Sequence, residues 1–204
     1  LKTYKNYQQK GVRVDWASVI DDTALDKLLT TGFLVLDGCF DGDFVRALQQ
    51  ESGFVAYKKA SLTHGETLEH IRGDHIRWID DACPCGVQYS EQLLALGKWL
   101  NRTLFTTIRQ VESHYACYPA GFGYDWHKDN PKGRDERIFS VVYYLNDDWQ
   151  ADDGGAICLI DKADKLQILL PKANRLVIFD SNLRHQVAKT HRVRYSIASW
   201  LRCD

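Results

Sequence analysis

The sequence predicts an α+β fold, mainly β, in which N-terminal helices brace a C-terminal jelly-roll barrel. Up to about residue 105, apolar residues recur with helical spacing. After residue 110 the pattern changes to short apolar runs bounded by turn residues, which favours an antiparallel sandwich or barrel. A chain of 204 residues suits one well-buried domain, so we expect one domain with helical support in 1–110 and the barrel core in 111–204.

Two helix caps and one apolar run organise the first fifty residues. Asp22 or Thr23 can cap one helix and Asp41 or Asp43 another, because short polar side chains accept hydrogen bonds from the first free backbone N–H groups. Between these caps, FLVL at 33–36 is typical of a buried strand.

A third helix is predicted from Ser90, its expected N-cap, because leucines recur at intervals of three and four through residue 104. The preceding segment, at about 57–77, is polar and interrupted. We therefore expect a surface loop or lid there.

The barrel core is predicted from six short apolar runs that turn residues separate. They are ESHYACYP at 112–119, RIFSVVYYLN at 137–146, GGAICLI at 154–160, LQILLP at 166–171, NRLVIFD at 174–180 and RYSIASWL at 194–201.

Composition argues against two kinds of partner. The 26 basic and 27 acidic residues leave a net charge of −1, so the sequence offers no electrostatic footprint for nucleic acid. Its apolar runs stay far below the roughly 20 residues that a membrane span needs. The N-terminus also lacks the apolar segment of a secretory signal, so we expect a cytoplasmic protein without membrane partners.

The six cysteines are expected to be reduced and mostly buried. Only Cys83-Pro84-Cys85 is closely spaced, and a structural zinc site usually needs a second such pair.

The stretch YDWHKDNPKG at 124–133 contains the first candidate metal ligands. In a strand, His127 and Asp129 share one face, and together they make a two-point chelate. A metal site needs at least one more ligand, so the pair alone is weak evidence, and a polar strand end that runs into a turn is the favoured alternative until other ligands are found.

His185 is the best-placed candidate for the third ligand, because it follows the predicted strand at 174–180 and can face the first pair across a barrel; a surface loop histidine is the alternative. His114 could face the interior. The remaining histidines fall in or beside the expected lid or in a turn: His64, His70, His75 and His191.

Arg194 adds a second kind of evidence. It shares one face of its predicted strand with Ser196, Ala198 and Trp200, and an arginine there must reach solvent or meet an anion, because a buried unpaired guanidinium is very costly. Two histidines, one aspartate and a nearby arginine suggest a facial-triad Fe(II) site that binds a dicarboxylate.

At this point the sequence resembles the Fe(II)- and 2-oxoglutarate-dependent dioxygenases. Within them it is most similar to the prolyl hydroxylases that act on hypoxia-inducible factor and to their bacterial relatives. The resemblance implies a double-stranded β-helix, that is, a jelly-roll core. The motifs that carry it are IRGDHIRWID at 71–80, CYPAGFGYDWHKDNP at 117–131, VYYLNDDW at 142–149, GGAICLI at 154–160 and RYSIASW at 194–200.

The resemblance implies that His127, Asp129 and His185 bind Fe(II), with 2-oxoglutarate and O₂ as cosubstrates and ascorbate as a candidate stimulant. No further catalytic residue is implied, because the metal and the cosubstrate supply the chemistry.

Three residues are implied at the cosubstrate. Arg194 would pair with the distal carboxylate of 2-oxoglutarate, Tyr144 would donate to the same carboxylate, and Tyr118 would lie close by. Ala198 stands where the animal enzymes carry a threonine, a departure that bears on cosubstrate affinity.

Arg72, Asp74 and Trp78 are implied to shape the substrate entrance; the alternative for the first two is a local surface ion pair. Trp200 is expected to be a core residue.

The implied activity is prolyl 4-hydroxylation of a protein substrate, which yields hydroxyproline, succinate and CO₂. Elongation factor Tu is the candidate substrate of a bacterial chain; an animal chain would point to hypoxia-inducible factor and oxygen sensing. One alternative is an oxygenase that hydroxylates a small molecule or another residue. A nucleic-acid demethylase is disfavoured, because that branch carries a second arginine where this chain has Trp200. The remaining alternative is a non-catalytic jelly-roll binding module.

Overall fold

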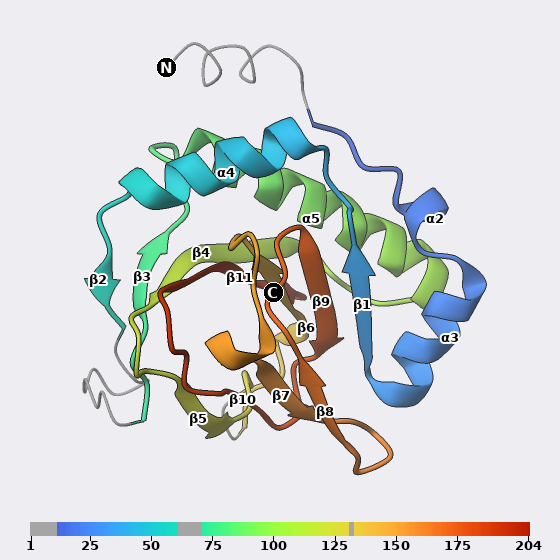
Figure 1. The fold of residues 1–204 in the computed structure, drawn as a ribbon. Helices are drawn as coiled ribbons and strands as arrows, with labels where there is room; N and C mark the ends of the chain where they lie inside the picture. Colours follow the sequence, from blue (N-terminus) through green and yellow to red (C-terminus); the bar gives the residue numbers. More distant parts are fainter. Residues whose placement is uncertain (1–11, 61–70, 131–132) are drawn as a thin grey trace.

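The computed structural model describes residues 12–60, 71–130 and 133–204 (Figure 1). Its helices are α2 (Trp16–Val19), α3 (Asp22–Thr31), α4 (Gly42–Phe54), α5 (Pro84–Leu104) and the short 3-10 helix η1 (Ala151–Asp153). Its strands are β1 (Phe33–Asp37), β2 (Lys58–Lys59), β3 (His75–Trp78), β4 (Gln110–Tyr118), β5 (Tyr124–His127), β6 (Arg137–Tyr144), β7 (Ile157–Ile160), β8 (Leu166–Leu169), β9 (Arg175–Asp180), β10 (His185–Val187) and β11 (Arg194–Arg202). None of these helices is long and apolar enough to cross a membrane.

The strands form two antiparallel sheets that enclose the interior of a jelly roll. The larger sheet has the order β1-β9-β6-β11-β4-β3-β2, and the smaller has the order β5-β10-β7-β8. Six apolar side chains from the two sheets pack together between them: Phe33, Tyr144, Ile157, Leu159, Val177 and Phe179. The predicted mainly β fold with a jelly-roll core is confirmed.

Strand β11 lies at the middle of the larger sheet and pairs with β4 on one side and β6 on the other. Its residues alternate as predicted. Ile197 and Leu201 belong to the core under the helices, whereas Arg194 and Ser196 face the interior of the barrel. The same strand therefore builds both the core and the inner wall.

Helices α4 and α5 cover the outer face of the larger sheet (Figure 1). Apolar residues on their inner faces, among them Phe44, Leu48, Leu93 and Leu96, are completely buried. The predicted cap at Asp41 is confirmed, because its carboxylate accepts the Phe44 N–H at 2.9 Å. Helix α3 is capped one residue earlier than predicted, by Asp21.

The predicted start of the third helix was wrong. Helix α5 begins at Pro84, and Ser90 lies inside it, with its hydroxyl donating to the Gly86 carbonyl. Proline suits a first helical turn because its missing N–H would be unpaired there. The cap comes from another helix: the buried Glu51 carboxylate of α4 accepts the N–H groups of Cys85 at 2.9 Å and Gly86 at 2.8 Å. No local sequence signal reveals such a partner.

Within the segment expected to be a lid, the structure shows a pair of strands. Strand β2 pairs with β3, which begins at His75 and pairs in turn with β4. The rest of the predicted lid, residues 61–70 with His64 and His70, lies outside the described residues.

All six cysteines lie within the described residues. Three of them, Cys83, Cys85 and Cys158, are buried, and the other three are partly exposed.

We predict that Glu51→Ala lowers the free energy of unfolding by about 2–4 kcal/mol, because two N–H groups of α5 and the Tyr115 hydroxyl lose their buried acceptor. Glu51→Gln keeps one acceptor oxygen and should cost less. Urea denaturation measures both, with Glu91→Ala on the exposed face of α5 as control. A Glu51→Ala variant as stable as that control would contradict the capping role.

Candidate metal and cosubstrate site

A cavity of about 370 Å³ opens between the two sheets. Strands of the larger sheet line one wall and β5, β7 and β10 of the smaller sheet contribute to the other. Of the nine residues predicted from the sequence to contact metal, cosubstrate or substrate, eight line this cavity, and Tyr144 does not. The hydroxyl of Tyr144 is buried next to it, beside the Arg194 guanidinium.

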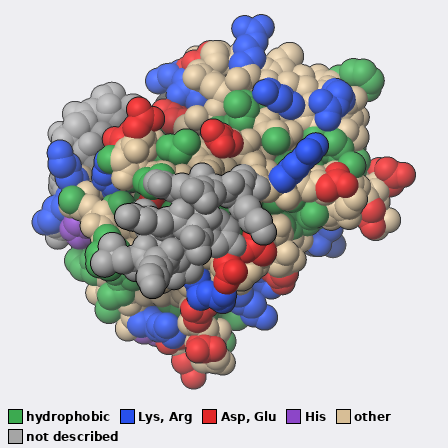
Figure 2. Space-filling view, turned by 90° about the horizontal axis from the view of Figure 1, so that it is seen from above, with side chains coloured by type: hydrophobic (Ala, Val, Ile, Leu, Met, Phe, Trp, Pro, Cys, Tyr) green, Lys and Arg blue, Asp and Glu red, His purple; other side chains and the backbone are tan. Residues whose placement is uncertain are grey.

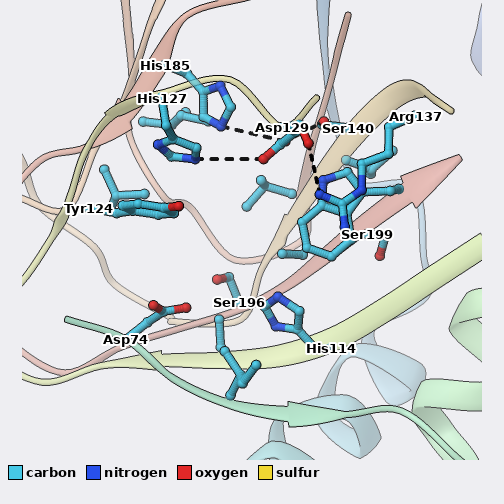
Figure 3. A pocket seen from close by; sticks show the side chains of 18 of the residues that line it. Asp74, His114, Tyr124, His127, Asp129, Arg137, Ser140, His185, Ser196 and Ser199 are labelled. Atoms are coloured by element: carbon cyan, nitrogen blue, oxygen red, sulfur yellow. Dashed lines mark hydrogen bonds and ion pairs between the residues drawn. The ribbon is translucent and has the colours of Figure 1, made fainter. Parts of the chain in front are cut away.

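The three predicted metal ligands converge at one point of the cavity (Figure 3). His127 ends β5, His185 begins β10, and the two residues face each other in the strand register. Asp129 lies two residues beyond β5, with its carboxylate oxygens 3.7 Å from His127 Nε2 and 3.6 Å from His185 Nε2. The ligand atoms all lie within 4.8 Å of one another, which fits three protein ligands on one face of a metal ion.

Backbone carbonyls fix both imidazoles in the orientation that a metal requires. Nδ1 of His127 lies 2.6 Å from the Asp125 carbonyl oxygen, and Nδ1 of His185 lies 3.0 Å from that of Leu183. A carbonyl only accepts, so each Nδ1 carries the proton and each Nε2 keeps its lone pair. Both lone pairs are then available where the Asp129 carboxylate lies.

The charges of the triad also suit a cation. Burial, followed by the neighbouring His185, lowers the pKa of His127 to about 4, so this imidazole is neutral near pH 7. Burial alone would raise the pKa of Asp129, but His185, His127 and the Ser140 hydroxyl outweigh it and lower that pKa. The site therefore presents an ionised carboxylate at Asp129 and a neutral imidazole at His127.

Arg194 and Tyr144 are two buried polar groups that lie side by side in the barrel. Arg194 is 1% exposed, and its guanidinium donates to the Gly155 carbonyl at 2.9 Å and to Ser196 Oγ at 3.1 Å. No carboxylate of the described residues pairs with it. The rings of Tyr118 and Tyr144 each lie 5.0 Å from the guanidinium, and the Tyr144 hydroxyl has no partner within the described part of the chain.

A dicarboxylate cosubstrate fits these groups. A buried cation without a counter-charge and a buried hydroxyl without an acceptor are both costly, and one carboxylate satisfies both. Burial raises the pKa of Tyr144, so its hydroxyl stays protonated and can donate.

The three residues expected at the substrate entrance also line the cavity. Arg72 and Asp74 form a bidentate ion pair at 2.7 and 3.2 Å, and Asp74 is only 3% exposed, so the pair is not a surface one. The Arg72 guanidinium lies 5.0 Å from the Tyr124 ring, which stacks on His127 at 3.6 Å. Trp78 is 44% exposed at the edge of the cavity. Their contact with substrate stays a prediction.

Several cavity residues are not apparent from sequence. Ser140 donates to the Asp129 carboxylate at 2.5 Å, and Tyr124 packs against a ligand ring. Trp200, expected in the core, is buried but belongs to neither apolar cluster, and it lines the cavity. The sequence could have indicated this position, because Trp200 shares one face of β11 with Arg194.

Among the cavity-lining residues, His114 is the histidine that lies outside the triad (Figure 3). Its ring lies 5.1 Å from that of Trp78 and 5.4 Å from that of Trp200. The prediction that it faces the interior is confirmed. It is 2% exposed, and burial lowers its pKa from 6.5 to about 4.

A pH dependence of stability follows from His114. Between pH 6.5 and 4 the unfolded chain binds a proton at this residue and the folded chain does not, so the free energy of unfolding falls as the pH falls. By pH 5 the loss should reach about 2 kcal/mol for this histidine. Urea denaturation at pH 7 and pH 5 should show a smaller loss in His114→Gln; an equal loss in both proteins would contradict the assignment.

Comparison with known proteins places this site in a family. The model of the 2OG-Fe(II) oxygenase superfamily matches residues 113–202, which include the triad and Arg194. The mouse protein named prolyl hydroxylase EGLN3 is 31% identical over 213 residues, covering 93% of this chain and 86% of the relative. Human Egl nine homolog 1 is 35% identical over 170 residues, but this chain spans only 39% of its length.

Two solved structures share the fold across their length. A Pseudomonas putida prolyl-4-hydroxylase has a TM-score of 0.81 at 32% identity, with 89% of this chain and 98% of that chain covered. A Trichoplax adhaerens prolyl hydroxylase, in complex with a hypoxia-inducible factor peptide fragment, has a TM-score of 0.81 at 26% identity, with 98% and 90% covered. The chain therefore belongs to the 2OG-Fe(II) oxygenase superfamily, and within it is homologous to the Egl nine prolyl hydroxylases.

Proposed function

We propose that this chain is an Fe(II)- and 2-oxoglutarate-dependent prolyl 4-hydroxylase that acts on a proline in a protein substrate. The observation that carries the proposal is the joint presence, in one cavity, of the His127–Asp129–His185 triad and the buried Arg194 without a counter-charge. The similarity to proteins named prolyl hydroxylases supports the choice of proline.

Held by the triad, Fe(II) would bind 2-oxoglutarate and O₂ and supply the oxidation that yields succinate, CO₂ and a hydroxylated proline. The chain's own residues supply position. Arg194 is already oriented by Gly155 and Ser196, so a carboxylate can bind it without reorganising the side chain. Tyr144 donates to that carboxylate, and Tyr118 covers the guanidinium from another strand. The burial of these groups excludes water from the cosubstrate's distal end.

The cavity around the triad suits an apolar ring. Trp78, Trp200 and Tyr124 present aromatic surface to the cavity, and Arg72 with Asp74 fixes the polar side of the entrance. Elongation factor Tu is the proposed partner of a bacterial chain. The peptide in the Trichoplax relative suggests hypoxia-inducible factor, with an oxygen-sensing role, for an animal chain. A cytoplasmic location belongs to the same proposal.

The direct test is mass spectrometry of candidate protein substrates after incubation with Fe(II), 2-oxoglutarate and ¹⁸O₂. A hydroxyproline that carries the heavy oxygen is the expected product. If the label appears in a small molecule or on another residue type, the prolyl assignment fails while the oxygenase assignment stands. If no succinate forms with any substrate, the chain is a binding module.

We predict that His127→Ala and Asp129→Ala each abolish hydroxylation and weaken metal binding, because two remaining ligands are too few for a stable facial site. Calorimetric titration of the metal-free protein with Co²⁺ separates loss of metal from loss of substrate. His191→Ala, which removes an exposed histidine that does not line the cavity, is the control. Full iron-dependent turnover in either ligand variant would refute the assignment.

Arg194→Ala should raise the KM for 2-oxoglutarate by about 10–100-fold, because a charge-assisted pair to the carboxylate is lost. Tyr144→Phe removes one neutral hydrogen bond and should raise it by about tenfold or less. Steady-state kinetics with varied 2-oxoglutarate measures both, with the exposed Arg102→Ala as control. A cosubstrate KM that Arg194→Ala leaves at the Arg102→Ala value would contradict this role.

A further inference from the structure

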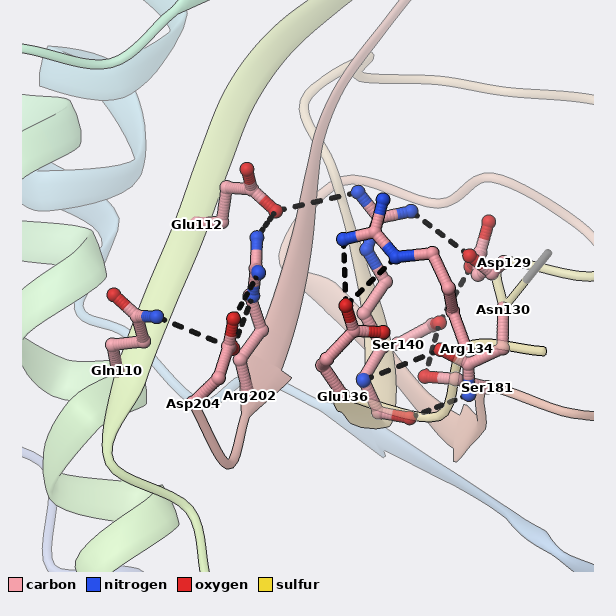
Figure 4. Close-up of polar contacts among 11 residues, drawn as sticks. Gln110, Glu112, Asp129, Asn130, Arg134, Glu136, Ser140, Ser181, Arg202 and Asp204 are labelled. Carbon is pink, nitrogen blue, oxygen red and sulfur yellow. Dashed lines mark hydrogen bonds and ion pairs between the residues drawn. The ribbon is translucent and has the colours of Figure 1, made fainter. Parts of the chain in front are cut away.

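Four charged side chains at one end of the larger sheet form a connected group, here called the rim cluster: Glu112, Arg137, Arg202 and Asp204. Figure 4 labels Glu112, Arg202 and Asp204 of this group. Glu112 Oε2 accepts from Arg202 Nη1 at 2.8 Å and from Arg137 Nη2 at 3.3 Å. Arg202 makes two further bonds to the Asp204 carboxylate, at 2.9 and 2.6 Å. One carboxylate thus holds two guanidinium groups side by side.

Strand register brings these residues together. On β11, Trp200 faces Glu112 of β4, and Arg202 faces Arg137 of β6. The Arg137 guanidinium lies 3.9 Å from the Trp200 ring, so the side chain is fixed by an aromatic face as well as by a carboxylate.

Arg137 connects the rim cluster to the triad. Its Nη1 donates to the backbone carbonyl of Asp129 at 3.0 Å. The next residue, Asn130, accepts the Arg137 backbone N–H at 3.2 Å and donates to the Arg137 carbonyl at 2.9 Å. Both the backbone and the side chain of Arg137 therefore hold the segment that carries Asp129.

This matters because Asp129 is the triad member that no strand contains. His127 and His185 are held by the pairing of β5 with β10, whereas Asp129 follows the end of β5. Its position depends on hydrogen bonds: its N–H to the Ser181 carbonyl, its carboxylate to Ser140, and its carbonyl to Arg137. Loss of a group that orients a metal ligand typically weakens metal affinity by about 10–100-fold.

We propose that Glu112 and Arg202 are positioning residues for the metal site. Arg202 holds the Glu112 carboxylate, and Glu112 holds the Arg137 guanidinium against the Asp129 carbonyl. Together they keep the Asp129 carboxylate where the two imidazoles can share a metal ion with it. The inference rests on the ligand set of the proposed function and is independent of the substrate. Glu112 is not among the residues that line the cavity, so its effect must pass through Arg137.

The test is calorimetric titration of the metal-free full chain with Co²⁺. Glu112→Gln should weaken Co²⁺ binding by about tenfold, because the Arg137 side chain loses its charged anchor. Arg202→Met removes the guanidinium that holds the Glu112 carboxylate, and it should also weaken Co²⁺ binding. Thermal unfolding of each variant shows that it is folded.

The matched control is Glu136→Gln. Glu136 pairs with Arg134 in the same region, at 2.6 Å, and no hydrogen bond of its side chain reaches Asp129 or Arg137 within the described residues. Its substitution removes the same charge, so Co²⁺ affinity should stay within about twofold of the parent protein. Equal weakening by Glu136→Gln and Glu112→Gln would show a general charge effect and overturn the proposal.

A double-mutant cycle tests whether Glu112 acts on the metal site through Arg137. In an Arg137→Met background, Glu112→Gln should have no further effect on Co²⁺ affinity, since the connecting side chain is gone. Full additivity would overturn the proposal, and so would a Glu112→Gln variant that binds Co²⁺ like the parent. His127→Ala distinguishes failure of the proposed ligand set from failure of the positioning role. If His127→Ala binds Co²⁺ like the parent protein, the ligand set itself is refuted. If His127→Ala weakens Co²⁺ binding but Glu112→Gln does not, only the positioning role is refuted.

Discussion

The alternation of side chains along β11 is the constraint on which the rest of the molecule depends. Because this strand pairs on both sides, it cannot shift by one residue without turning Ile197 and Leu201 into the cavity and Arg194 into the helical core. The apolar contacts with the helices thus fix the register that places Arg194 inside the barrel. Core packing and cosubstrate geometry are two results of one pairing pattern.

Most strands can be predicted from sequence because the pattern of apolar residues within each strand is local. A helix end is harder to predict where its capping group belongs to a distant part of the chain. The apolar run at 33–36 and the cap at Asp41 depend only on neighbouring residues, and both are confirmed. The start of α5 depends on Glu51, which approaches from another helix. Strand β2 needs β3 as its partner, so its two lysines carry no signal of their own.

Residues of the site likewise differ in how far local sequence reveals them. His127 and Asp129 are close in sequence, and Arg194 stands out because a charged residue interrupts an apolar strand. His185 could be chosen only by its place after a strand, and the register between β5 and β10 explains why that place is right. Ser140 carries no such mark: a serine in a strand is ordinary until its carboxylate partner is known.

The two walls of the cavity contribute different halves of the site. The imidazoles stand on the smaller sheet, whereas Arg194 and Tyr144 stand on the larger one. A cosubstrate that reaches from metal to guanidinium therefore acts as a crosslink between the sheets, and its binding free energy is coupled to their separation. The apolar cluster between the sheets sets that separation in advance. A methyl group gained or lost at Val177 or Leu159 would consequently change ligand affinity without touching the ligand.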